Sequence, residues 1–337
     1  MTDRKVGAIF WPLKATLYLV SLVYGLAIAV RAVLYRYGIF ESRSVPMKII
    51  SVGNITLGGT GKTPFVIYLV KLFRSEFAKD PAVLIRGYGW DETAMLKAKL
   101  PDTPILTGEN RVKSAYRAIK LYGSDTAILD DGFQHWELKR DLNIVLVDSR
   151  KPFGNSFLFP RGVLREGKKA LRRADVVVLT KAGSPEADVD AVKREVLAVN
   201  PDIDFVEASH EPDRIYDIKK KEPLDASVIS GKRVILLSSI ADPAYFKDMA
   251  TSLGAEVVEH IEFPDHHNYG ESDRAYIAKR CEERSFDMIL TTEKDAVKLG
   301  RMNMSFGRYA VMVLAIDIGI IAGKEKLVDR LHSLYTR

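Results

Sequence analysis

The 337-residue sequence contains a single cysteine, Cys281. One thiol cannot form an intrachain disulfide, and without a cysteine cluster the chain cannot build a thiolate zinc site. Such sparse use of cysteine suits a reducing cytosol. Internal repeats and low-complexity segments are also missing from the sequence. A chain of this length usually folds into about two domains.

Excess positive charge is confined to the start of the chain. Lysine and arginine number 50 against 44 aspartate and glutamate residues. Residues 1–48 hold seven of the basic and two of the acidic residues, so the rest of the chain is nearly neutral, at 43 against 42. A nucleic-acid-binding protein more often carries its excess charge on the folded domain. We therefore expect no nucleic-acid partner.

The basic residues of this segment flank an apolar run, ATLYLVSLVYGLAIAV, at residues 15–30. Lys14 precedes the run, and Arg31 and Arg36 follow it. The sixteen uncharged residues are slightly few for a spanning helix, which needs about 20. A secretory signal and a buried core helix both fit the pattern. Cations on both flanks favour a membrane-associated helix that lies in one leaflet.

Apolar runs alternate with helical patterns along the next part of the chain. The runs are rich in Val, Ile and Leu, as in strands that are buried on both faces. They occupy residues 48–52, 82–86, 126–129, 143–147 and 175–180, and helical patterns occupy 64–77 and 111–121. This alternation predicts an α/β fold, with a mostly parallel sheet and helices on both of its faces.

A second alternation follows a more polar stretch at residues 184–231, in which we expect a linker near 215–230. Strands are predicted at 233–238, 256–263, 287–290 and 309–315, and helices at 243–253, 271–283 and 324–335. These elements suffice for a second, smaller α/β domain.

The most informative segment is residues 49–63, IISVGNITLGGTGKT. An apolar strand feeds a glycine-rich loop whose amide groups can surround a polyphosphate, and Pro64 suits the first turn of a following helix. Lys62 is expected to reach the β- and γ-phosphates, and the Thr63 hydroxyl to hold Mg²⁺. Thr56 stands where the usual phosphate-loop pattern has glycine. The predicted nucleotide-binding residues are Thr56, Leu57, Gly58, Gly59, Thr60, Gly61, Lys62 and Thr63.

Two acids, Asp130 and Asp131, end the apolar run at 126–129. In a phosphate-loop fold, an aspartate at this strand end lies beside the loop threonine and fixes Mg²⁺ directly or through water. Gln134 and His135 follow, at the edge of the sheet where open α/β folds bind ligands. We expect these two residues either to bind substrate or to brace the loop.

Two further loops carry candidate residues. After the run at 82–86, Arg86 is a candidate phosphate ligand and Asp91 a candidate base for an acceptor hydroxyl, although a solvated turn explains the segment somewhat better on this evidence alone. In the irregular segment 160–166, Arg161 and Arg165 are candidate transition-state cations or surface arginines.

In the second domain, Asp265 and His266 end the predicted strand at 256–263. A carboxylate beside an imidazole can form an acid–base pair. Metal binding by His266 and His267 is disfavoured, because adjacent residues seldom point at one ion. The segment 291–295 ends the next strand and starts a helix, as a capping sequence does.

Taken together, these motifs are similar to those of a known family. VGNITLGGTGKTP, RGYG, ENR, DDGFQH, RDLNIVLVD, FGN, PRGVLRE, FPDHH and TTEKDAVKL occur in this order. The set resembles the tetraacyldisaccharide 4′-kinase family of lipid A biosynthesis, across roughly residues 10–330. It is far more specific than the phosphate loop alone.

The resemblance implies ATP-dependent phosphorylation, with Mg²⁺, of the 4′-hydroxyl of a tetraacylated glucosamine disaccharide 1-phosphate. It implies a peripheral or monotopic protein on the cytoplasmic face of a Gram-negative inner membrane, whose partners are the lipid substrate and the membrane surface.

The expected organisation is a membrane-associated helix at 1–38, a P-loop kinase domain at 39–220, and a smaller α/β domain at 221–337 that closes over the ATP site. The last helix is able to pack back on the first domain. Oligomeric state is left open.

The resemblance also assigns roles by position. Asp91 falls where the family has its base and His266 where it has the histidine partner, although only Trp90 separates Asp91 from Gly89, a shorter segment than is usual in the family. Arg165 and Glu166 fall in the family's Leu-Arg-Glu loop. The implied catalytic residues are Asp91, His266, Lys62 and Arg165, and the implied metal-site residues are Thr63, Asp130, Asp131 and Glu166.

Two other classes of phosphate-loop protein, GTPase switches and membrane-surface ATPases, share part of this pattern. A GTPase switch needs an Asn-Lys-x-Asp motif after a strand, and the nearest segment, residues 180–183, lacks the aspartate. A membrane-surface ATPase of the partitioning or targeting type is the stronger alternative. Such ATPases carry a signature lysine before Gly-Gly, where this chain has Leu57.

Overall fold

The computed structural model describes residues 11–87, 89–302, 306 and 309–336. The chain folds into two compact units, each built from separate stretches of sequence. The first unit contains residues 1–87, 102–209 and 318–337, and the second contains residues 88–101 and 210–317. The domain boundaries expected from the sequence, at residues 38 and 220, stay a prediction.

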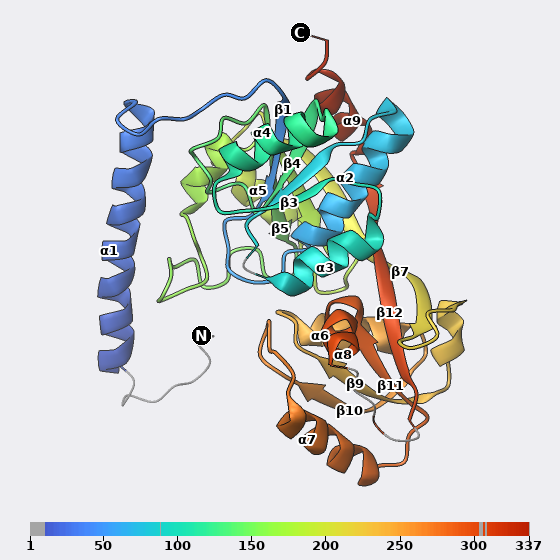
Figure 1. The fold of residues 1–337 in the computed structure, drawn as a ribbon. Coiled ribbons are helices and arrows are strands. Elements are labelled where there is room, and N and C mark those ends of the chain that lie inside the picture. Colours follow the sequence, from blue (N-terminus) through green and yellow to red (C-terminus); the bar gives the residue numbers. More distant parts are fainter. Residues whose placement is uncertain (1–10, 88, 303–305, 307–308, 337) are drawn as a thin grey trace. The chain divides into compact units, whose positions relative to one another are not determined.

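The first unit is organised around a parallel sheet (Figure 1). Its strands lie in the order β7-β6-β5-β1-β4-β2-β3 and all of these neighbours pair in parallel. The strands are β1 (Lys48–Gly53), β2 (Ala82–Ile85), β3 (Ile105–Thr107), β4 (Thr126–Asp130), β5 (Leu142–Asp148), β6 (Val176–Thr180) and β7 (Asp204–Asp217). Their carboxyl ends meet along one edge, where open α/β folds bind ligands.

Helices cover both faces of this sheet. Val145 and Val177 point to one face, where they pack with Val192 of α5. Leu84 and Leu129 point to the other, where they pack with Val112 of α4. The helices of the unit's globular part are α2 (Lys62–Phe77), α4 (Arg111–Tyr122), α5 (Val189–Leu197) and α9 (Lys324–His332), with a 3₁₀ turn at Lys168–Arg173. This arrangement confirms the predicted α/β class with helices on both faces.

The second unit repeats the scheme on a smaller scale. Its parallel strands lie in the order β10-β9-β11-β12. Successive residues of β9 face opposite ways, with Leu236 packing toward Phe246 of α6 and Leu237 toward Ile277 of α7. The elements are α3 (Trp90–Lys99), β8 (Pro223–Leu224), a 3₁₀ turn at Ala226–Ile229, β9 (Arg233–Ser238), α6 (Pro243–Ser252), β10 (Glu256–Glu262), α7 (Glu271–Glu282), β11 (Met288–Thr292), α8 (Glu293–Arg301) and β12 (Val311–Ala322).

Two polar segments differ from the sequence-based expectation. The start of the expected linker near 215–230 is wrong, because residues up to Asp217 belong to strand β7. This strand looks polar because residues 211–214 within it are exposed. Asp91 was expected within the first domain, at residues 39–220, either as a candidate base or in a solvated turn. It lies instead in α3, which packs against α8 and therefore belongs to the second unit.

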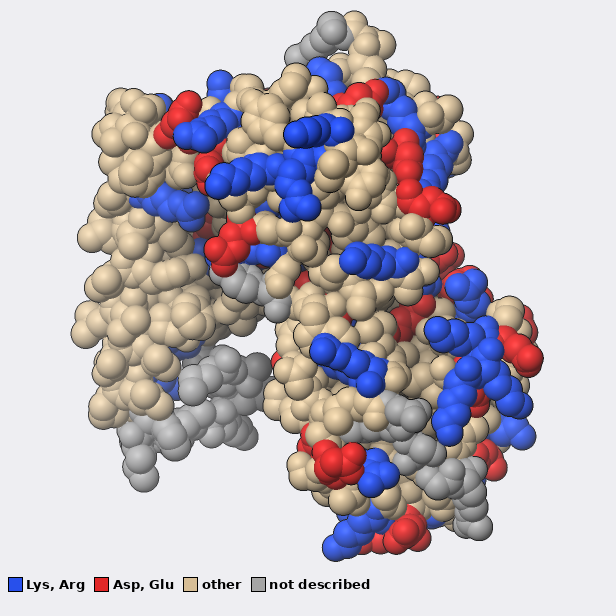
Figure 2. Space-filling view, viewed as in Figure 1, with Lys and Arg blue, Asp and Glu red and all other residues tan. Residues whose placement is uncertain are grey.

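Helix α1 (Trp11–Arg36) is the N-terminal element of the described chain. It is 26 residues long, and its most apolar window has a mean hydropathy of 2.1 with 6% of that window buried. By length and composition it is able to cross a membrane. Figure 2 shows that the visible surface of α1 is largely uncharged. Because so little of α1 is buried, the core-helix alternative does not fit.

Candidate active site

The glycine-rich loop joins β1 to α2 in the first unit. Gly58 and Gly61 have φ values of +107° and +81°, a region that glycine enters without strain. Gly61 is the residue before α2, and no side chain caps the helix there. The 16-residue helix therefore presents its positive end to the loop, as anion-binding helices do.

Neighbouring residues fix the shape of this loop. The amide of Asn54 donates to Thr60 Oγ1 at 3.0 Å, and both side chains are buried. The backbone N–H of Leu57 donates to the Val163 carbonyl at 2.6 Å. Thr56 forms an isolated antiparallel bridge with Leu164. The first residues of the loop are thus tied to the segment that carries Arg165, and their contact with a nucleotide stays a prediction.

The two acids after β4 have different partners. Asp130 is buried and its Oδ2 accepts a hydrogen bond from Thr63 Oγ1 at 3.2 Å. Asp131 Oδ1 lies 3.6 Å from Lys62 Nζ and 2.7 Å from Arg165 Nη1. Asp130 therefore stands beside the loop hydroxyl, whereas Asp131 is paired with cations.

Electrostatics keep Asp131 ionised. Burial raises the pKa of this carboxyl, but the positive charges of Lys62, Arg165 and Arg111 together hold the pKa below its ordinary value. The backbone of Asp131 adopts a φ of +55°, which is uncommon outside glycine and suits aspartate better than most residues. The fold thus places a fixed negative charge between two cations at the phosphate loop.

Glu166 and Gln134 brace the loop. Both carboxylate oxygens of Glu166 accept from Arg173 at 2.9 Å, and Gln134 Nε2 donates to one of them at 3.0 Å. The same Gln134 nitrogen donates to the Asn54 carbonyl at 2.9 Å. These contacts are of the loop-bracing kind, and the role of Gln134 stays a prediction. Glu166 is buried and already hydrogen-bonded, and its role as a metal ligand stays a prediction.

A basic region surrounds His135 on the same edge of the sheet. Burial, together with the charges of Arg111, Arg140, Arg31 and Arg86, lowers the pKa of His135 to about 4. Its Nε2 atom is buried and has no hydrogen-bond partner among the described residues. A neutral imidazole among arginines suits a site for an anionic ligand. Arg111 and Arg140 were missed as site residues in the sequence, although Arg111 belongs to the ENR motif.

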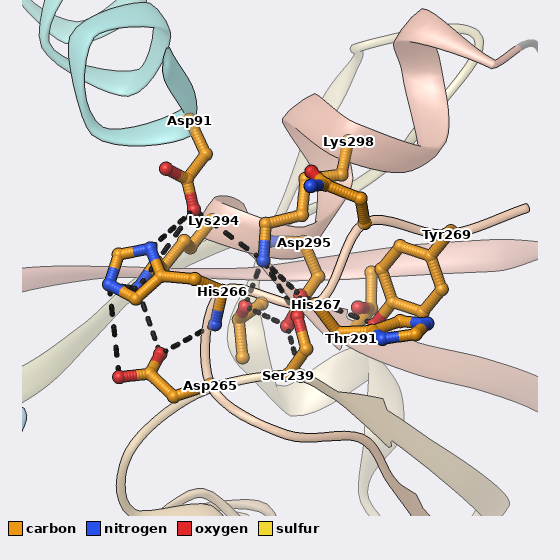
Figure 3. A network of polar contacts seen from close by, with 12 residues as sticks. Asp91, Ser239, Asp265, His266, His267, Tyr269, Thr291, Lys294, Asp295 and Lys298 are labelled. Atoms are coloured by element: carbon orange, nitrogen blue, oxygen red, sulfur yellow. Dashed lines mark hydrogen bonds and ion pairs between the residues drawn. The ribbon is translucent and has the colours of Figure 1, made fainter. Parts of the chain in front are cut away.

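The second unit brings Asp91 and His266 together (Figure 3), whereas the sequence-based expectation placed the two residues on different domains. Asp91 lies in the first turn of α3 and is almost fully buried. His266 lies in the loop after β10, with a φ of +60°. His266 Nδ1 is 3.3 Å from Asp91 Oδ2. The catalytic roles of the two residues stay a prediction, which their geometry allows.

Two lysines of α8 also approach Asp91. Lys298 Nζ lies 3.5 Å and Lys294 Nζ 4.0 Å from Asp91 Oδ2. Burial raises the pKa of Asp91, but the charges of Lys294, His266 and Lys298 outweigh it and lower the pKa below its ordinary value. Asp91 is therefore a carboxylate at neutral pH. The sequence signal for the lysines was their spacing, since residues four apart share one helix face.

Comparisons with known proteins support the family resemblance that was found in the sequence. A family model described as tetraacyldisaccharide-1-P 4′-kinase matches residues 13–90 and 89–336. Curated relatives named tetraacyldisaccharide 4′-kinase include one from Syntrophus aciditrophicus, which is 38% identical over an alignment of 321 positions that covers 86% of each chain. Another, from Desulfatibacillum aliphaticivorans, is 38% identical and covers 85% of this chain and 83% of its own.

The chain belongs to the tetraacyldisaccharide 4′-kinase family. A crystal structure of LpxK from Aquifex aeolicus in complex with ATP is similar in fold, with a TM-score of 0.74 and 28% identity. The match covers 95% of this chain and 99% of that one. The family resemblance found in the sequence is confirmed, and membership favours a kinase over a partitioning or targeting ATPase.

The low pKa of His135 predicts how stability depends on pH. In the unfolded chain this histidine gains a proton near its ordinary pKa of 6.5, but in the folded protein only near 4. The unfolded state thus binds more protons in this window, so stability falls as pH drops from about 6.5 to about 4. We expect His135→Gln to lose less stability over this range, by about 1 kcal/mol after allowance for solvent screening.

Chemical denaturation of the detergent-solubilised protein at several pH values measures this difference. His332→Gln, which changes an exposed histidine of α9, is the matched control and should follow the wild type. An identical pH dependence in His135→Gln and the wild type would show that His135 does not resist protonation in the fold.

Proposed function

We propose that this protein transfers the γ-phosphate of ATP to the 4′-hydroxyl of a tetraacylated glucosamine disaccharide 1-phosphate, a late step in lipid A biosynthesis. The observation that carries the proposal is the buried Asp91 carboxylate 3.3 Å from His266, in a chain that also has an ATP-type phosphate loop. Membership of the tetraacyldisaccharide 4′-kinase family supplies the substrate class.

The first unit has the residues to bind Mg²⁺–ATP. Thr63 Oγ1 and Asp130 Oδ2 lie 3.2 Å apart, so a hydroxyl and a carboxylate, both oxygen ligands of the kind Mg²⁺ prefers, stand side by side. Mg²⁺ usually takes few protein ligands and keeps several waters. These two residues therefore fit the metal. When bound, the ion neutralises charge on the β- and γ-phosphate oxygens.

Lys62 and Arg165 are proposed to stabilise the transferring phosphoryl group. In the structure both cations are paired with Asp131, which holds their side chains at the loop. Arg165 is also fixed through its backbone, because its N–H donates to the Ile55 carbonyl at 2.8 Å. Cations held in advance need little reorganisation when charge develops in the transition state.

Asp91 is proposed to accept the proton of the sugar hydroxyl. Its carboxylate is ionised at neutral pH, and His266 at 3.3 Å orients it. The sugar oxygen attacks the γ-phosphorus, the bond to the β–γ bridging oxygen breaks, and ADP leaves. The phosphate-loop residues belong to the first unit and Asp91 to the second.

The basic region near His135 is proposed to bind the phosphate already present on the acceptor. Arg86 and His135 were candidate substrate residues from the sequence, and Arg111 joins them in the structure. A neutral histidine with a buried, unpartnered Nε2 among the described residues is able to donate to a phosphate oxygen. Arginine suits this ligand because its planar fork matches phosphate geometry.

Helix α1 is proposed to hold the protein on the cytoplasmic face of a bacterial inner membrane. Its surface is apolar and exposed, and ATP is a cytosolic substrate. A tetraacylated acceptor stays in the bilayer, because extracting acyl chains costs about 0.8 kcal/mol per CH₂. The enzyme must therefore work at the membrane surface, and α1 supplies the attachment.

The proposed function predicts transfer of label from [γ-³²P]ATP to the disaccharide 1-phosphate in mixed micelles. Product is measured by extraction into organic solvent. We expect Asp91→Asn to lower turnover by about 10²–10⁴-fold, as for a lost general base, while Mg²⁺–ATP affinity stays unchanged. Lys62→Met should instead weaken nucleotide binding, because it removes a phosphate-binding cation.

Glu282→Gln is a matched control for Asp91→Asn, since it neutralises an exposed acid of α7 in the same unit. Near wild-type turnover of Asp91→Asn at saturating ATP and acceptor would exclude Asp91 as the base. Label appearing only in inorganic phosphate, regardless of acceptor, would instead identify an ATPase and refute the kinase function.

The attachment role of α1 predicts that the exposed apolar side chains determine membrane binding. Replacing Leu19, Val23 and Leu26, whose exposed fractions are 62%, 69% and 66%, by glutamine should move the protein from the membrane fraction toward the soluble fraction. Each replacement reduces the apolar area that the helix can bury in the lipid, and membrane binding weakens with that area. Sedimentation with vesicles of bacterial lipid measures the change.

The matched control replaces Tyr116, Leu121 and Tyr122, which are exposed on α4, by glutamine. That variant should sediment like the wild type. Equal sedimentation of the α1 variant and the wild type would show that another surface attaches the protein.

A further inference from the structure

Lys298 is a buried cation to which the proposed reaction assigns no role. Its side chain is 2% exposed. Its ammonium donates to Ser239 Oγ at 2.7 Å and lies 3.4 Å from Asp295 Oδ1 and 3.5 Å from Asp91 Oδ2 (Figure 3). A charged amine is costly to bury, and it persists only where such partners surround it. Lys298 is therefore held by one acid on its own helix and faces a second on α3.

Asp295 holds Lys298, and it is itself held by several hydrogen bonds. This carboxylate is fully buried, and the backbone N–H of Ser239 donates to its Oδ2 at 2.9 Å. Thr292 Oγ1 donates to the same oxygen at 2.8 Å, and the Tyr269 hydroxyl donates to Oδ1 at 3.2 Å. Burial and the charge of Asp295 raise the pKa of Tyr269, so its hydroxyl keeps the proton that it donates. Asp295 cannot move toward Asp91 without breaking these bonds.

Lys294, the other lysine near Asp91, is held less tightly. It is 17% exposed and lies 4.0 Å from Asp91 Oδ2. Its ammonium donates to Asp265 Oδ1 at 3.0 Å and contacts His266 Nε2 at 3.3 Å. Both partners belong to a partly exposed loop. Lys298, by contrast, is anchored among buried groups.

The groups that face Asp91 come from three elements. Lys294 and Lys298 belong to α8, and His266 belongs to the loop after β10. From its own helix, the backbone N–H of Glu92 donates to Asp91 Oδ1 at 3.0 Å. Of the charged side chains in this set, Lys298 is the most deeply buried and the only one joined to Ser239 and Asp295 in the described contacts.

We propose that Lys298, locked by Asp295 and Ser239, is a positioning residue that holds Asp91 as a correctly placed carboxylate for the acceptor hydroxyl. This inference rests on the proposed role of Asp91 as the base. A buried carboxyl favours its neutral form, which cannot accept a proton. The fixed ammonium offsets that preference, and its charge does not change during the reaction. Lys298 thus acts through Asp91 and does not contact the acceptor.

The test is a direct titration of Asp91 in Lys298→Met, a substitution that keeps the length of the side chain and removes its charge. Full-length protein labelled with ¹³C at the aspartate carboxyl is titrated by NMR, with the Asp91 signal assigned from its loss in Asp91→Asn. We expect the titration midpoint of Asp91 to rise by about one pH unit or more. Lys279→Met, which removes an exposed charge from α7, should leave the midpoint unchanged.

The same rise should appear in the kinetics. The acidic limb of the pH profile of kcat/KM should move to higher pH by the same amount. At a fixed pH on that limb, kcat/KM should fall about tenfold for each pH unit of the shift. The KM for Mg²⁺–ATP should not change, since Lys298 belongs to the other unit. If Lys298→Met does not fold because Asp295 is left unpaired, the double variant Lys298→Met/Asp295→Asn removes both buried charges and should give the same shift.

The outcomes separate this inference from the proposed function. An Asp91 midpoint that stays at the wild-type value in the folded variant overturns the role of Lys298, whatever the activity. A midpoint that rises while the pH profile stays fixed shows that Asp91 is not the base, and it overturns the positioning role together with that assignment.

Discussion

Pairing of buried carboxylates with fixed cations is the interaction on which both halves of the chemistry depend. Burial raises the pKa of Asp131 and of Asp91, and in both cases neighbouring cations reverse the shift. Lys62 and Arg165 do so at the phosphate loop, and lysines of α8 do so with His266 at Asp91. Without these cations, burial would shift both carboxyl groups toward their neutral forms, which accept a proton less readily.

Parallel sheets explain why these charges meet where they do. In the first unit, the carboxyl ends of β1 and β4 are neighbours, so the loop after β1 and the acids after β4 share one edge. In the second, Ser239 follows β9, His266 follows β10, and α8 follows β11, three adjacent parallel strands. Each unit thus assembles its polar residues from loops that the same sheet edge brings together.

Much of this could be predicted from the sequence. The strands β1, β4 and β9 were found because runs of buried apolar residues have a strong local signal, and the loop from Gly58 to Thr63 has a specific spacing. The pairing of Asp91 with His266 came from family resemblance, since no local pattern places two distant residues in contact. The fold class and the family are confirmed, whereas the roles of the individual site residues stay predictions.

What the sequence could not predict depends on tertiary packing. Helix α3 lies in the second unit because it packs on α8, a contact that neither segment encodes alone. Lys298 was missed because a lysine near the end of a helix usually lies in water. Only the buried partners Ser239 and Asp295 show that this one does not. Strand β7 was missed because its exposed middle looks like a polar linker.

We propose that Asp91 and His266 act as one unit in activating the acceptor hydroxyl. A double-mutant cycle on phosphoryl transfer, with Asp91→Asn, His266→Gln and the double variant, tests this claim most directly. We expect kcat/KM of the double variant to be no lower than that of Asp91→Asn, because the pair is already broken in the single variant. If the fold-loss in kcat/KM of the double variant instead equals the product of the two single losses, Asp91 and His266 act independently and the proposed pairing is wrong.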